Sequence, residues 1–318
     1  MTDGRDAASR LLDIRAVSLP DETLGRHLPA GRLVRVRLRE QVEALLEAEL
    51  TIRAGREHGV HDARVACRRL RSALATFAPV IRPEASRPLN EELRWLGRSL
   101  GDARDLDVAR ERLLALAERY AGDAEDAGPL IERVRAEDWS HRHGNRGGLE
   151  VLDSGRYDHL LDALEAVVVD PPWTPDADEG ADPFLRRRIR KEWRALASLV
   201  ALVADVEPGG APDEPLHDIR KAAKRLRYAL EVAQVLWPRK PRRLRKRIQR
   251  LTDILGERQD TVLSRAALRE LATQAETAGL PTHIHSRILQ MEDAHAAELE
   301  AQFQREWSAA VERRHTWP

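Results

Sequence analysis

The sequence predicts an all-α protein, and three observations support this prediction. A fourteen-residue stretch at 61–74, HDARVACRRLRSAL, recurs at 217–230 as HDIRKAAKRLRYAL, and nine of the fourteen positions are identical. Apolar residues recur with the helical spacing of about 3.6 residues along most of the chain. No stretch of useful length has the alternating, β-branched pattern of a strand. The repeat indicates an internal duplication, and short loops between helices indicate antiparallel packing.

The two copies of the motif place many cations on one face of a helix. Ala66, Leu70 and Leu74 share the apolar side of the first copy at about 100° per residue. Solvated faces usually mix Glu with Lys, whereas the only acids here are Asp62 and Asp218, at the favourable helix starts. We therefore interpret the cationic faces as an anion site rather than as ordinary solvated surface. The candidate residues are His61, Arg64, Arg68, Arg69 and Arg71 in the first copy, and His217, Arg220, Lys221, Lys224, Arg225, Arg227 and Tyr228 in the second.

The duplication extends to both sides of the motif. Downstream, the Leu-Gly pair at 100–101 matches that at 255–256, and the glycine is expected to allow close approach of a neighbouring helix. Asp105 is expected to pair with a motif cation. Arg104 joins the candidate site, although Gln259 replaces it in the second half. Upstream, two cations precede each copy at the same distance and also join the site: Arg32 and Arg35, and Arg188 and Lys191.

Breaks in the helical periodicity set the expected elements. Residues 1–29 form an arm with one short helix, bounded by Pro20 and Pro29. The segment DPPWTPDADEGADP lacks periodicity and is the predicted linker. Helices are expected at 32–53, from 60 to Pro83, from Pro88 through Leu113, at 126–141 and 156–169, then at 184–203, from 217 to Pro238, at 241–279 and at 281–307, with a turn at 141–148. The predicted organisation is an arm at 1–29, a first repeat at 30–169, a linker at 170–183 and a second repeat at 184–318.

The charge of the chain is balanced overall but uneven along its length. The 318 residues include 53 Lys and Arg and 53 Asp and Glu. Residues 182–250 nevertheless hold nineteen Lys and Arg against eight Asp and Glu, a net charge of +11. Concentrated basic charge is typical of a protein with a polyanionic partner, and arginine suits forked contacts to phosphate oxygens.

The number of cysteines and the hydropathy of the chain indicate the cellular compartment in which we expect the protein. Cys67 is the only cysteine, which excludes a disulfide within the chain and a cysteine-based zinc site and favours a reducing compartment. The first fifteen residues lack the apolar region of a signal peptide. The longest apolar run, Ala195 to Ala204, is too short to cross a bilayer. We expect a cytoplasmic protein.

The duplicated helix that begins with His-x-x-Arg and a basic run resembles the CHAD (conserved histidine α-helical domain) family. The matching stretches are Val60–Leu74, Leu96–Val108, Leu216–Glu231 and Leu251–Asp260. The resemblance implies two antiparallel four-helix-type bundles related by a pseudo-twofold axis, which form one CHAD domain with a basic central cavity. It also implies binding of inorganic polyphosphate, without a cofactor, and association with polyphosphate granules. About thirty residues precede the first long helix and no acidic ExExK motif occurs, so we expect a stand-alone CHAD protein without enzymatic activity.

Two other functions remain open on sequence grounds. A nucleic-acid backbone binder fits the basic charge, although aromatic residues make up only 4% of the chain and base stacking needs them. A metal-dependent phosphohydrolase fits the dipeptides His61-Asp62 and His217-Asp218, but the neighbouring cations would repel a metal ion. His141, His143, His283 and His285 are expected to be structural or solvated rather than metal ligands. The basic run at 239–250 is the first alternative location for the polyanion.

Overall fold

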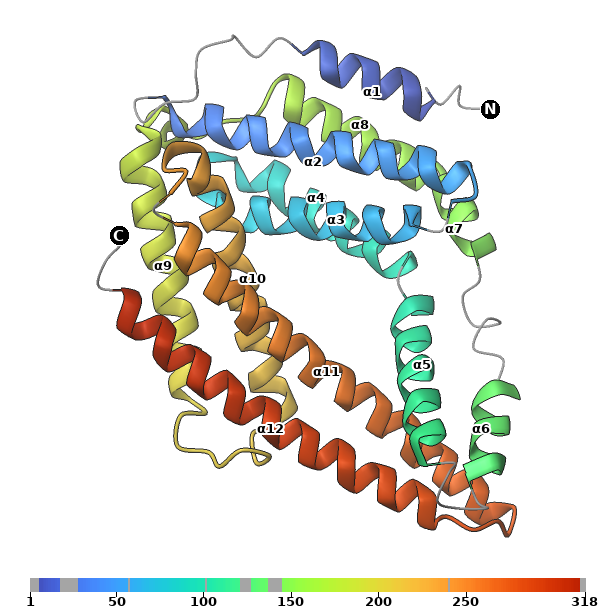
Figure 1. Cartoon of the computed structure of the whole chain (residues 1–318). Helices are drawn as coiled ribbons and strands as arrows, with labels where there is room; N and C mark the ends of the chain where they lie inside the picture. The colour runs from blue at the N-terminus through green and yellow to red at the C-terminus, as the bar shows by residue number, and fades with distance from the viewer. Residues whose placement is uncertain are drawn as a thin grey trace.

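The computed structural model confirms the all-α prediction (Figure 1). It describes residues 6–17, 28–56, 58–100, 102–120, 127–136, 145–239 and 241–314, without the side chains of 102–109, 120, 127, 129, 136, 145–148 and 313–314. Within those residues the backbone forms helices and two short 3₁₀ turns. Extended pairing is limited there to two isolated bridges, Pro29 with Gly180 and Ile81 with Trp173.

The helices of the first half are, in chain order, α1 (Ala7–Ala16), α2 (Ala30–Arg53), α3 (Gly59–Thr76), α4 (Pro83–Ser99), α5 (Asp102–Tyr120), α6 (Ala127–Ala136), α7 (Asn145–Leu152) and α8 (Gly155–Val169), with the 3₁₀ turn η1 (Ala78–Val80). The second half has the 3₁₀ turn η2 (Pro175–Asp178), α9 (Ala181–Ala201), α10 (Asp213–Leu236), α11 (Arg242–Thr277) and α12 (His283–Arg314). The motif copies lie on α3 and α10, which contact each other. The pseudo-twofold bundle arrangement stays a prediction.

The region after the first motif helix differs from the expectation of one helix beginning after Pro88. Helix α4 begins at Pro83, because a proline at the first turn loses no intrahelical hydrogen bond. Pro88 therefore lies inside the helix. The chain then leaves the helix at Leu100, before α5, whereas the matching Leu-Gly pair of the second half continues through the uninterrupted α11. Helix α12 packs along α11 and supports it, as Figure 1 shows.

The expected turn at 141–148 is partly replaced by a helix. Helix α7 begins at Asn145, and 141–144, which include His141 and His143, lie outside the described residues.

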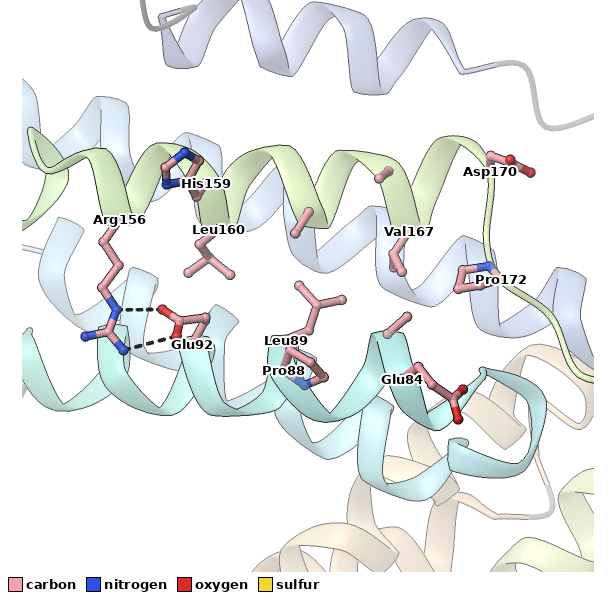
Figure 2. Close-up of a pocket in the computed structure, with 13 residues that line it drawn as sticks. Glu84, Pro88, Leu89, Glu92, Arg156, His159, Leu160, Val167, Asp170 and Pro172 are labelled. Atoms are coloured by element: carbon pink, nitrogen blue, oxygen red, sulfur yellow. Dashed lines mark hydrogen bonds and ion pairs between the residues drawn. The ribbon is translucent and has the colours of Figure 1, made fainter. Parts of the chain in front are cut away.

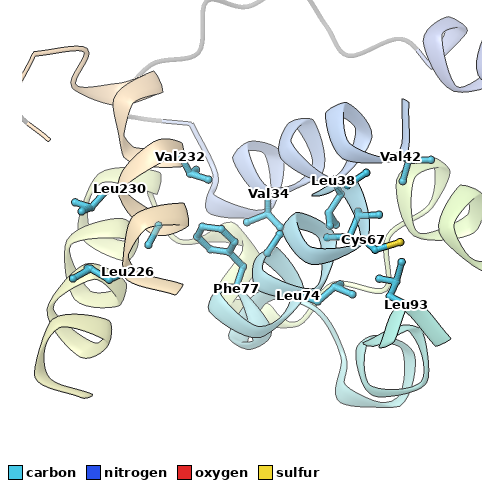
Figure 3. Packing of buried hydrophobic residues seen from close by; sticks show 14 of the residues in the cluster. Val34, Leu38, Val42, Cys67, Leu74, Phe77, Leu93, Leu226, Leu230 and Val232 are labelled. Carbon is cyan, nitrogen blue, oxygen red and sulfur yellow. The ribbon is translucent and has the colours of Figure 1, made fainter. Parts of the chain in front are cut away.

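One apolar core joins the two halves of the chain. Figure 3 shows Leu38 of α2, Leu74 of α3 and Leu226 of α10 pointing into this core. The rings of Phe77, after α3, and Phe184, on α9, stack with centroids 6.0 Å apart. Since both motif helices bury their apolar sides here, their cationic sides have to face outward from the core.

The predicted linker packs against the first half. Ala177 is buried, and a Cβ atom added at Gly31 of α2 would lie only 2.8 Å from the Ala177 Cβ. The Ala30 amide donates to the Glu179 carbonyl at 2.7 Å. The connection between the repeats is thus part of the folded body at these residues.

A second, smaller core lies where α5 and α6 meet α11 and α12, around Leu113, Val134 and Ile288. Beside it, the Arg112 guanidinium donates two hydrogen bonds of 2.9 Å to the buried Glu292 carboxylate of α12. This bidentate pair ties α5 to α12. None of the described helices is both long enough and apolar enough to span a lipid bilayer.

We predict that Cys67 resists alkylation in the native protein. Its thiol is buried beneath α2, and this burial raises its pKa to about 12 despite the opposing charges of Arg71 and Arg68. The thiolate is the reactive form, so iodoacetamide at pH 8 should modify the cysteine only after denaturation, as mass spectrometry would show. Native labelling at the rate of an unfolded peptide would contradict the burial.

Candidate anion-binding site

Where α3 packs on α4, Arg71 of α3 lies near Arg94 and Arg98 of α4. Arg68 lies three residues before Arg71 on α3, which makes the two side chains neighbours on that helix. We call these four arginines the α3–α4 arginine cluster. The Arg71 Nε atom donates to the Asn90 Oδ1 atom of α4 at 3.0 Å. Burial lowers the pKa of Arg71, and the nearby charges of Arg94 and Arg98 lower it further. The fold therefore holds like charges close enough to repel each other.

The cluster has no carboxylate to balance it within the described residues. Arg68, Arg94 and Arg98 are exposed, and none of them forms an ion pair with a described residue. The hydrogen-bond partner of Arg71 is a neutral amide. Guanidinium groups that share a surface without an acid attract anions, because a bound anion relieves their repulsion.

The motif cations of the second half mostly have acidic partners. Buried Glu192 of α9 accepts hydrogen bonds from Arg188 at 3.2 Å and from Arg225 at 3.3 Å. Glu231 likewise accepts from Arg227 at 2.6 Å and from Arg37 of α2 at 3.3 Å. These pairs join α10 to α9 and to α2.

One further motif cation is paired near the start of α10. The exposed Lys221 Nζ atom lies 2.9 Å from the Asp218 carboxylate. Lys221, Arg225 and Arg227 of the second copy thus have described acidic partners, whereas Arg68 and Arg71 of the first copy form no ion pair with a described residue.

The start of α10 packs closely on α11, as the glycine of the repeat predicts. A Cβ atom at Gly256 would lie 2.8 Å from an Arg220 guanidinium nitrogen, so any larger residue would push this side chain aside. His217 of α10 contacts Gln259, which lies on α11 three residues after Gly256. Burial lowers the pKa of His217, as does the positive charge of Lys221, while the Gln259 contact opposes both.

The repeat alignment explains why the halves differ. With Leu100 matched to Leu255, the counterparts of Arg94 and Arg98 are Gln249 and Asp253. These two side chains bond to each other, with Gln249 donating at 2.6 Å. The second half keeps a different cation there, Arg245, in the place of Asn90.

Several predicted site residues have other surroundings. Arg35 donates to the carbonyls of Val168 and Val169 at 2.7 and 2.6 Å and caps the end of α8. Tyr228 is buried, with the Arg227 guanidinium 4.1 Å from its ring centroid. The remaining placements are these: Arg188 is buried, Lys191 and His61 are exposed, Arg32, Arg64 and Lys224 are half-buried, Arg69 lines a small pocket between α2 and α3, and the side chains of Arg104 and Asp105 lie outside the described residues.

Arg94 and Arg98 are absent from the sequence-based site. Their spacing of four residues on a predicted helix was a usable signal, because it places both on one face. The neighbouring Glu91 and Glu92 gave that helix a mixed charge and concealed the signal. In the structure Glu92 turns away from the cluster toward α8, where it binds Arg156.

A cavity of about 610 Å³ between α4 and α8 is a different kind of site (Figure 2). Leu89, Leu160 and Val167 line it. At one end Arg156 donates to both Glu92 carboxylate oxygens, at 2.7 and 3.0 Å. Because this arginine is balanced and the walls are mainly aliphatic, the cavity does not suit a polyanion.

The His-Asp dipeptides lack the companions of a metal site among the described residues. No group of three or more His, Cys, Asp or Glu side chains converges in that part of the chain. Asp218 is held by Lys221, whose charge lowers the pKa of this carboxyl group. A cation beside the carboxylate opposes binding of a second cation.

Comparisons with known proteins match most of this chain to one family of domains. The CHAD domain family model matches residues 36–269. The CHAD domain of the plant Ricinus communis superposes with a TM-score of 0.65 at 26% identity, over 89% of this chain and 93% of that domain. PptA from Streptomyces chartreusis superposes with a TM-score of 0.75 at 20% identity, over 88% of this chain and 99% of that one, a likeness of fold.

Two curated relatives are similar in sequence. They are uncharacterized proteins of Mycobacterium tuberculosis strains CDC 1551 and H37Rv, each 32% identical over 294 residues. The alignment covers 89% of this chain and 54% of each relative, so the chain spans about half the length of the curated relatives it matches.

We predict that His217 titrates below the usual value of about 6.5. Because its folded-state pKa is lowered, the unfolded chain binds this proton more readily. The histidine's contribution to stability is thus present above about pH 6.5 and is lost as the pH falls toward the lowered folded-state value. NMR titration should give this midpoint, and Lys221→Gln should raise it, whereas Lys191→Gln on α9 should not. A midpoint at or above 6.5 would contradict the structure.

Proposed function

Since the chain belongs to the CHAD domain family, we propose that it binds inorganic polyphosphate through the cationic faces of α3, α4 and α10. The α3–α4 arginine cluster carries this proposal, because it is a dense group of cations without carboxylate partners among the described residues. We propose a binding role without catalysis, and the same affinity would recruit the protein to polyphosphate granules. The basic central cavity that the family resemblance implies belongs to this proposal.

The chemistry of polyphosphate matches such a surface. The polymer is a flexible chain of negative charges without bases, so a receptor needs repeated cationic donors and little else. Arginine forks give charge-assisted hydrogen bonds to phosphate oxygens. Residues three or four positions apart on a helix place these forks about 5 to 6 Å apart along the helix axis. Release of condensed counterions from the polymer adds a salt-dependent gain.

The aromatic residues of these helices do not support a reader of single-stranded nucleic acid. Base stacking needs an exposed aromatic face. Tyr228, the one aromatic residue of α10, is buried. Trp95, the one aromatic residue of α4, lies beneath the Arg156 guanidinium, 4.2 Å from the ring centroid. Helix α3 has none. The cations of these helices can therefore contact the phosphates of a nucleic acid, but the helices offer no exposed aromatic ring for its bases.

We predict that the double variant Arg68→Glu with Lys224→Glu binds long-chain polyphosphate roughly 100-fold more weakly, since two hydrogen bonds to charged groups are worth about 3 kcal/mol together. Calorimetry on the full chain measures this, and circular dichroism checks the helix content. The matched control is Arg190→Glu with Arg194→Glu, two exposed α9 residues that form no ion pair with a described residue. Equal losses in both variants would indicate a non-specific charge effect.

Competition separates the polymer partners. At matched salt, long-chain polyphosphate should displace duplex DNA at a lower phosphate concentration than DNA displaces polyphosphate. The opposite order would favour a nucleic-acid backbone binder, and metal-dependent release of phosphate would favour the hydrolase.

We predict tighter polyphosphate binding as the pH falls through about 6.5. The free His217 has a lowered pKa, and a bound phosphate raises it, so binding takes up a proton. Affinity should rise between the bound-state and free-state pKa values and level off below both. The polymer should be long, so that the terminal phosphates, which titrate near neutral pH, contribute little to the measured pH dependence. In His61→Gln with His217→Gln the pH slope should vanish, and a slope that survives would assign the proton to another group.

A further inference from the structure

We infer that the α3–α4 arginine cluster is an oligophosphate site in its own right, able to hold a linear phosphate of a few units without the second half of the motif. This inference rests on the proposed function. It also assigns Arg94 and Arg98 to the site and makes the two halves unequal in binding.

The first argument is the balance of charge in each half. The first half offers exposed Arg68, Arg94 and Arg98, without an ion pair to any described residue, beside the half-buried Arg71. An incoming phosphate therefore displaces no described carboxylate from these groups. It also relieves the repulsion that the fold imposes on Arg71.

The second argument is that carboxylates compete for the matching cations. A phosphate that engages Arg225 or Arg227 competes with Glu192 or Glu231, which are held at 3.3 Å and 2.6 Å. Glu192 is 6% exposed, and withdrawing its partners would leave a buried charge uncompensated. Arg225 ties α10 to α9, and Arg227 shares Glu231 with Arg37 of α2. Both arginines are engaged within the fold, so the second half contributes less to binding.

The third argument is the size of the cluster. Arg94 and Arg98 are four residues apart, or about 6 Å along α4, and Arg68 and Arg71 are about 4.5 Å apart along α3. Packed helices have axes about 8 to 10 Å apart. Two rows of long, forked side chains at these spacings enclose an anion of a few phosphate units. A long polymer is not required to span them.

The direct test is calorimetric titration of the full chain with tripolyphosphate at low salt, beside long-chain polyphosphate and orthophosphate. Wild type should bind tripolyphosphate at one site per chain, and orthophosphate far more weakly. Arg94→Gln with Arg98→Gln should weaken tripolyphosphate about 100-fold through loss of two charge-assisted contacts. Both side chains are exposed, so the fold should be retained.

Two further variants serve as comparisons. Arg190→Gln with Arg194→Gln on α9 removes the same charge at the same spacing and should leave tripolyphosphate binding within about twofold of wild type. Lys221→Gln with Lys224→Gln on α10 should weaken the long chain more than tripolyphosphate, because only the polymer reaches both halves.

The outcomes separate this inference from the proposed function. If wild type binds long-chain polyphosphate but not tripolyphosphate, the inference is overturned and the proposed function stands. The inference also falls if the α4 variant binds tripolyphosphate normally, or if the α10 variant loses as much as the α4 variant. If wild type binds none of the phosphates, the proposed function itself is overturned.

Discussion

The structure depends on burial of the apolar sides of α3 and α10 in one core shared by both halves. Leu70 and Leu226 are fully buried, and each is surrounded by neighbours from other helices. Burying a leucine side chain is worth about 1.5 to 3 kcal/mol, and several such residues fix the rotation of each motif helix. Because the cationic side of each motif helix lies opposite its apolar side, this rotation also fixes the direction in which the cations point. The core thus supplies the free energy that holds like charges together at the α3–α4 contact.

The two halves use the same motif for different physical purposes. On α10, Arg225 meets buried Glu192 of α9, and half-buried Glu231 accepts from Arg227 and from Arg37 of α2. Such pairs specify how α10 sits against α9 and α2 more than they add stability. On α3, Arg71, the equivalent of Arg227, faces α4, where it donates to the amide of Asn90 and lies near Arg94 and Arg98. The duplicated sequence has in this way diverged: Arg225 and Arg227 of the second half are engaged by acids within the fold, whereas Arg68 and Arg71 of the first half form no ion pair with a described residue. Two sets of positions differ: Val36 and Ala75 stand where the second half has Glu192 and Glu231. On α4 and α11, Asn90, Arg94 and Arg98 stand against Arg245, Gln249 and Asp253.

The far ends of the long helices are held by different means. Around Leu113 and Ile288 the core is small, and the bidentate pair of Arg112 with buried Glu292 secures α5 on α12. Near the middle of α11, buried Arg258 donates to Glu300 at 2.7 Å and to Asp213 at 2.9 Å. Glu300 in turn accepts the Gly209 amide at 2.6 Å, in a turn whose positive φ of 92° requires glycine. Polar contacts therefore set the loop before α10, and with it the position of His217.

The sequence by itself determined the helical class, the duplication and the amphipathic motif, because these follow from periodicity, and it predicted the close approach of a neighbouring helix at Gly256. It also predicted Arg68 and Arg71 as site cations. Only the tertiary structure decided that Arg35 caps α8, that Glu192 and Glu231 pair with Arg225 and Arg227, that α4 ends at Ser99 while α11 continues, and that Arg94 and Arg98 lie near Arg71. The physical reason is that helical spacing defines the faces of one helix. Which acid or cation from another helix meets a given arginine depends on how the helices rotate and pack, and no local pattern records that.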